Sequence, residues 1–111
     1  MSSEPAQIDF SKVITAEDRA RAARADYVAA IKAEAARRIV ATCPEWKQRN
    51  LIVEASILAE KGRANWTEAD RAAWEAQEAI WHRIDEIRAA SDRLEAAPET
   101  VADLTDDTLW V

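Results

Sequence analysis

His82 is the only histidine of the chain, and three carboxylates lie near it in the sequence. Glu78 precedes it by four residues, and Asp85 and Glu86 follow within the next four, which is the spacing of neighbours on a helix. Imidazole and carboxylate groups bind metals, but this set lacks the further oriented ligands that a zinc ion needs. We therefore expect an exposed histidine among ion pairs, and no bound metal.

Cys43 is the only cysteine, so the chain cannot form an internal disulfide or a zinc site built from cysteines, which favours a reducing compartment. It lies near the predicted start of a helix, where a helix dipole can activate a thiol. Because the sequence offers that thiol no basic partner, we expect a small, inert, buried side chain. A chain with one glycine has no glycine-rich phosphate loop, and Ser56 and Ser91 fall in mid-helix. These features predict no catalysis and no cofactor.

Composition indicates one helical domain with a thin core. The 111 residues suit a single domain and include 25 alanines, one glycine and three prolines. Alanine buries little area, so one chain alone gains little from its core. The net charge of −6 argues against a protein whose main task is to grip phosphate backbones. The chain does not begin with basic residues followed by an apolar run, and no stretch approaches the ~20 apolar residues of a membrane span. We therefore expect a protein that is cytoplasmic when it is made.

Start and stop signals divide the chain into an arm at 1–14, a helical domain at 15–97 and a tail at 98–111. Within the domain they predict helices at about 16–41, 44–61 and 68–97. Thr15 and Thr67 each stand where a hydroxyl can cap a first turn that carries acidic residues. Thr42 and Glu45 have the spacing of a capping box around Pro44, and Gly62 is suited to end the second helix. The fold class is therefore all-α.

Apolar spacing predicts how these helices pack. The first helix has a stripe at spacings of four, formed by Tyr27, Ile31, Ala35 and Ile39. The second has one side formed by Trp46, Asn50, Val53 and Ile57, with Leu51, Ala55 and Leu58 close by. The third has a heptad seam formed by Ile80, Ile84, Ile87, Ser91 and Leu94, which extends back through Gln77 and Ala73. Only about four residues join the last two helices, so we expect an antiparallel hairpin with the long N-terminal helix packed on it.

Five tryptophans are many for a thin core, and tryptophan is enriched at binding hot spots. Trp46, Trp74 and Trp81 fall where they can fill the core of the hairpin. Trp66 in the turn and Trp110 in the tail lie on no apolar helical stripe. Each of these two must therefore either cap the hairpin or meet a partner.

Residues 43–110 resemble the C-terminal helical region of phage tail fibre assembly proteins. The likeness lies in the stretch Pro44–Leu51, the turn from Gly62 to Trp66, Trp74, the segment from Trp81 to Asp92, and the final Trp110. That family has a β-rich or variable region before this part, where this chain has an arm and an alanine-rich helix. The resemblance implies binding to a receptor-binding fibre, help in its folding or trimerisation, and a place in the host cytoplasm during assembly or on the virion tail.

From the sequence we predict a phage tail-associated assembly or structural protein, with chaperone character and without catalysis. Its expected partner is a tail fibre or another virion protein, with neither nucleic acid nor membrane as a partner. The residues predicted to bind the partner are Trp66, Trp81, Leu109 and Trp110, with Tyr27 and Ile31 as a second contact.

Three alternatives stay open at this level. The first is a homo-oligomeric helical scaffold or adaptor without a fibre client, which the heptad seam of the third helix suggests. The second is a nucleic-acid-binding regulator that would use arginines of the first helix, namely Arg19, Arg21, Arg24, Arg37 and Arg38. The third is an enzyme, which would need a ligand or metal site that the sequence does not show.

Overall fold

A computed structural model describes residues 15–111, and the arm predicted at 1–14 lies outside the described residues. The described chain is all-α, as the sequence predicts. It contains α1 (Ala16–Thr42), α2 (Glu45–Lys61), the short 3-10 helix η2 (Arg63–Asn65), α3 (Glu68–Ala96) and a second 3-10 turn, η3 (Asp107–Trp110). None of its helices is both long and apolar enough to cross a bilayer.

Two capping boxes open the long helices, at the two threonines that the sequence predicts as caps. The Thr15 hydroxyl accepts a hydrogen bond from the Asp18 amide at 3.0 Å, and the Asp18 carboxylate accepts one from the Thr15 amide. Thr67 and Asp70 make the same reciprocal pair at the start of α3, with distances of 3.1 and 2.9 Å. Each box satisfies backbone N–H groups that the first turn of a helix otherwise leaves without partners.

The prediction of a capping box at Thr42 is wrong. Thr42 is the last residue of α1, and its hydroxyl donates to the Arg38 carbonyl at 2.9 Å. Pro44 is itself the cap of α2, which begins at Glu45, and no side chain caps it. A different side chain secures the connection, because Gln48 donates to the Cys43 carbonyl at 2.8 Å. Thr42 therefore closes the helix before the break instead of opening the one after it.

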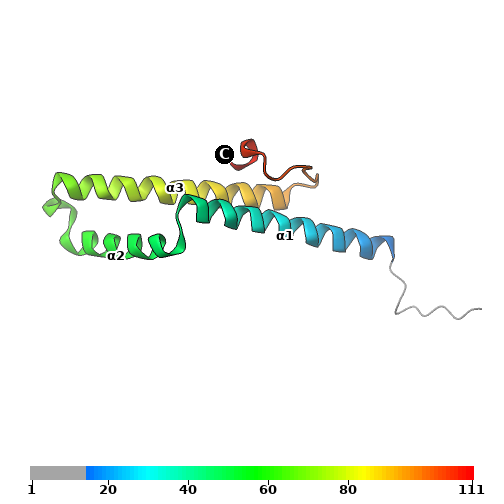
Figure 1. Ribbon diagram of the computed structural model, residues 1–111, viewed down its shortest axis with the longest axis horizontal. Helices are drawn as coiled ribbons and strands as arrows, with labels where there is room; N and C mark the ends of the chain where they lie inside the picture. Colours follow the sequence, from blue (N-terminus) through cyan, green and yellow to red (C-terminus); the bar gives the residue numbers. More distant parts are fainter. Residues whose placement is uncertain (1–14) are drawn as a thin grey trace, which may run out of the picture.

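The long helix α3 is the spine of the molecule (Figure 1). Helices α1 and α2 follow one another along the same side of it, α1 beside its C-terminal half and α2 beside its N-terminal half. The first turns of α1 run on past the end of α3, consistent with the absence of large apolar residues there. Arg24 ties the two helices together at that point by donating to the carbonyls of Glu95 and Ala97.

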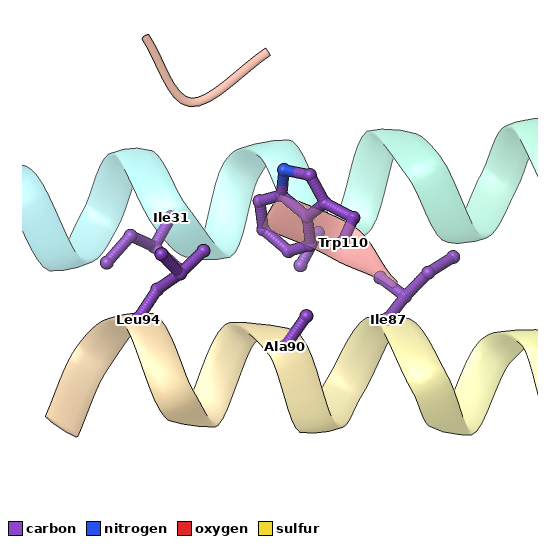
Figure 2. Close-up of a cluster of buried hydrophobic side chains, with 6 residues drawn as sticks. Ile31, Ile87, Ala90, Leu94 and Trp110 are labelled. Atoms are coloured by element: carbon purple, nitrogen blue, oxygen red, sulfur yellow. The ribbon is translucent and has the colours of Figure 1, made fainter. Parts of the chain in front are cut away.

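The main core lies between α1, α3 and the tail. The heptad seam of α3 meets the predicted stripe of α1, and the buried members of this cluster are Ile31, Ala35, Ile87, Ala90, Leu94 and Trp110. Figure 2 shows the Trp110 indole lying between the two helices beside these side chains. A second, smaller cluster joins α2 to α3 through Cys43, Leu51 and Ile84. The core is therefore divided into two parts, and the tail completes the larger one.

Arginines hold the tail in place. Arg38 donates to the Thr105 carbonyl at 2.8 Å, pairs with Asp107 at 2.9 Å, and lies over the Trp110 ring at 5.3 Å from its centroid. Arg83 donates to the Trp110 carbonyl at 2.7 Å. The Trp110 indole N–H in turn donates to the Leu104 carbonyl at 2.8 Å, so its polar edge is satisfied inside the fold.

Candidate protein-binding surface

Helix α2 has two apolar sides, and α3 covers only one of them. Leu51 and Leu58 are buried, with 8% and 5% of their surface exposed, and Leu51 belongs to the smaller core cluster. On the other side Trp46, Val53 and Ile57 are each 59% exposed. At about 100° per residue the two sides lie roughly 130° apart around the helix. Helix α3 therefore cannot cover both sides.

We call the exposed side, Trp46, Asn50, Val53 and Ile57, the α2 stripe. Its members are spaced by four, three and four residues, so they line up along one side of the helix for almost its whole length. Single exposed apolar residues are ordinary on a protein surface, but an aligned row that includes a tryptophan is typical of an interaction site. Ile52 is also exposed, at 57%, but it lies on a different side of the helix.

The placement of Trp46 corrects a prediction. Its indole does not fill the core of the α2–α3 pair, since most of its surface is exposed. Trp74 and Trp81, predicted for the same core, are half-buried. The sequence did contain a signal for this outcome, because Leu51, Ala55 and Leu58 form a second apolar row that competes for the same core.

Charged residues flank the α2 stripe in an uneven way. Lys47 and Arg49 lie on the flanks of the stripe in the first half of the helix, Glu54 lies on a flank in the second half, and Glu60 continues the line of the stripe. Three of these side chains are exposed, and Glu54 is half-buried. The surface that a partner meets is therefore apolar along its centre, basic on the flanks near the start of the helix and more acidic toward its end.

The far end of α2 is fixed by polar contacts with α3. Lys61 donates to the Asp70 carboxylate at 2.6 Å and holds the pKa of that carboxyl below its usual range. Gly62 follows with a φ of +81°, a conformation that side chains with a Cβ rarely adopt, and it turns the chain toward α3. The helix is thus held at its end while its outer side stays open.

Trp66 caps the turn between α2 and α3. Its ring is buried, and its indole N–H donates to the Leu58 carbonyl at 2.8 Å. The Trp74 ring lies 5.3 Å away, and the Arg63 guanidinium lies over both rings. Of the two roles predicted for Trp66, the structure shows the cap, and the ring offers a partner little exposed surface.

Four other residues predicted to bind a partner come together at the main core. Ile31 and Trp110 are fully buried there, and Tyr27 and Leu109 are half-buried at its edge. The Tyr27 hydroxyl accepts a hydrogen bond from the Val101 amide at 2.9 Å, so it helps to dock the tail. In this structure the four residues contact their own chain, and Trp110 caps the fold from the tail.

The residues considered for chemistry lie apart from one another. His82 is exposed on α3, with Nε2 3.7 Å from the Glu86 carboxylate. Trp81 beside it is half-buried against the smaller core cluster, and Cys43 is fully buried in that cluster. Across residues 15–111, no three His, Cys, Asp or Glu side chains are grouped as metal ligands would be.

No protein-family model, no curated protein and no solved structure matches this chain. Among the described residues the α2 stripe is an aligned row of exposed side chains, and of its members sequence reasoning placed Trp46 in the core.

Proposed function

We propose that this chain is a non-catalytic assembly or structural protein of a phage tail, which works by binding another protein through the α2 stripe. The observation that carries the binding role is the aligned exposure of Trp46, Val53 and Ile57 on one side of a helix whose other apolar side is buried. The resemblance of residues 43–110 to tail fibre assembly proteins supplies the class of partner, a tail fibre or a neighbouring virion protein.

The free energy available from covering the stripe suits such a role. Covering a half-exposed valine or isoleucine side chain yields about 1 kcal/mol, and a tryptophan yields more. Such a gain is significant for a chain whose own core is divided into two small clusters. Tyr27, Trp81 and Leu109, which keep part of their surface exposed, are secondary contacts in this proposal.

The test is a pull-down of the tagged full-length chain from cells that produce the phage or prophage, with partners identified by mass spectrometry. Three versions of the chain are compared: the unchanged chain, Ile57→Ser and Ile52→Ser. The two isoleucines are almost equally exposed on the same helix, but only Ile57 belongs to the α2 stripe. The two variants therefore match in chemistry and differ in the surface that they alter.

We expect a fibre or other virion protein to be recovered with the unchanged chain and with Ile52→Ser, and to be lost with Ile57→Ser. Its recovery at equal levels with both variants would remove the α2 stripe from the proposal. Recovery of the chain alone would contradict the fibre client and favour the self-assembling scaffold. Assays of purified particles then distinguish a structural subunit from a chaperone that is released.

A further inference from the structure

The α2 stripe has the spacing of a coiled-coil seam. Steps of four, three and four residues place its members at alternating d and a positions of a heptad, from Trp46 at d to Ile57 at a. Unlike the seam of α3, which α1, α2 and the tail cover, this seam has no cover among the described residues. A single helix with an open seam of this kind is completed by a second helix of matching pattern.

We propose that the α2 stripe binds a second copy of this chain, with the two α2 helices antiparallel. Trp46 then faces Ile57 of the second copy, and Asn50 faces Val53 of the second copy. This inference rests on the proposed role of the stripe as a binding surface and names its occupant. The stripe can hold only one of the two at a time, so the second copy and a virion protein compete for it, and the dimer is the form of the chain that has not bound a virion protein.

The register follows from the positions themselves. Antiparallel seams pair a positions with d positions, and pairing 46 with 57 also pairs 50 with 53, so every member of the stripe faces another member and each pair occurs twice in the dimer. A shift by one heptad in either direction leaves Trp46 or Ile57 facing a position outside α2.

Charge favours the antiparallel direction. In this register Lys47 lies beside Glu54 of the second copy, and the symmetry of the pair repeats that attraction. A parallel pair keeps an equivalent attraction, between Arg49 and Glu54, but it places Glu60 against Glu60 at the next seam position. Antiparallel helices also set the positive end of each helix dipole beside the negative end of its neighbour. The basic first half of each α2 thus meets the more acidic second half of the other.

The rest of the fold leaves room for this pairing. The stripe lies roughly 130° around α2 from the side that packs on α3. Helix α1 continues from the N-terminal end of α2 along the spine (Figure 1). Reversing the direction of the second copy therefore places the two α1 helices at opposite ends of the dimer. The result is an elongated two-fold assembly with the paired α2 helices at its centre.

The first test is sedimentation equilibrium of the full chain over a range of concentrations, with light scattering as a second measure of mass. We expect a reversible monomer–dimer equilibrium. Ile57→Ser weakens the dimer by at least tenfold, and the matched variant Ile52→Ser leaves its dissociation constant within about twofold. Far-UV circular dichroism shows that each variant is folded.

A charge exchange tests the register and direction. Lys47→Glu weakens the dimer about tenfold because attraction becomes repulsion at two symmetric positions, Glu54→Lys does the same, and the double variant restores it. Arg49→Glu makes an equal charge change on the same helix but faces Ser56 in the antiparallel dimer, so it has little effect. In a parallel pair the roles reverse, since Arg49 would lie beside Glu54 and Lys47 would have no acidic partner.

Each outcome settles the proposal. A folded chain that stays monomeric at every concentration, or a dimer that is sensitive to Arg49→Glu and insensitive to Lys47→Glu, would overturn it. A monomeric chain that still recovers a virion protein through Ile57 would overturn the antiparallel dimer and leave the proposed function standing. The two proposals can therefore fail separately.

Discussion

Replacing Trp110 by alanine removes the residue that joins the tail to the core. The indole is fully buried between α1 and α3, where it contacts the cluster that contains Ile31, Ile87 and Leu94. Its N–H also bonds the Leu104 carbonyl. Alanine at this position leaves a void that neither helix can fill without moving, and the tail loses its only large buried anchor.

The expected loss is large for a chain of this size. Truncation of a buried tryptophan to alanine costs about 3–5 kcal/mol, whereas a small domain is stable by only about 5–15 kcal/mol in total. A loss of about 4 kcal/mol corresponds to a fall in Tm of roughly 15 °C for a domain of about 100 residues. The polar contacts from Arg38 and Arg83 to the tail do not offset this loss, because they are already present in the unchanged chain.

Urea and thermal unfolding followed by circular dichroism measure this loss, and hydrogen exchange of the Val101 and Leu109 amides shows whether the tail is released. Trp46→Ala is the matched control, since the same residue type is removed from an exposed site. In dilute monomeric protein we expect that control to change the free energy of unfolding by less than about 0.5 kcal/mol. Equal midpoints for Trp110→Ala and the unchanged chain would refute the docking of the tail as described.

Three further predictions concern the helix ends and the tail interface. Thr67→Ala removes the cap of α3 and should lower the free energy of unfolding in urea by about 1 kcal/mol, whereas Thr67→Ser should keep most of that stability. Gly62→Ala should destabilise the chain by about 1 kcal/mol because the φ of +81° is unfavourable for alanine; an unchanged urea midpoint would contradict this conformation. Hydrogen bonds from Arg37, and the charge of Arg38, hold the pKa of the buried Glu34 carboxyl below its usual range. Ionised Glu34 therefore stabilises the fold above the ordinary carboxylate pKa of about 4, and this contribution is lost as the pH falls further. Glu34→Gln should flatten that part of the stability–pH curve, and an identical curve would contradict the contribution.

Local signals predicted much of the helical pattern. Thr15 and Thr67 cap their helices as expected, and the acids three residues later complete capping boxes because all partners lie within one turn. The Thr42 box failed because its hydroxyl has a competing acceptor inside α1, the Arg38 carbonyl. A spacing alone does not show which of two local partners a side chain takes.

The spacing of apolar residues could not predict which side of α2 packs on α3. Periodicity shows that the helix has apolar rows, but it does not show which row meets α3. Burial of Leu51 and Leu58 depends on contacts with Ile84 and on the turn at Trp66, which bring together residues far apart in the sequence. The position of Trp110 is likewise set by α1 and α3 together. Long-range packing thus decides which tryptophans are buried and which is exposed.

Photo-crosslinking in producing cells tests the role of the α2 stripe most directly. A benzophenone amino acid is placed at position 57, on the stripe, or at position 52, on another side of the same helix. Binding through the stripe predicts a discrete crosslinked product from position 57 that is absent or much weaker from position 52, and mass spectrometry identifies it as a virion protein, a second copy of the chain, or both. A folded protein that gives no product at position 57, or equal products at both positions, would contradict a binding role for the α2 stripe.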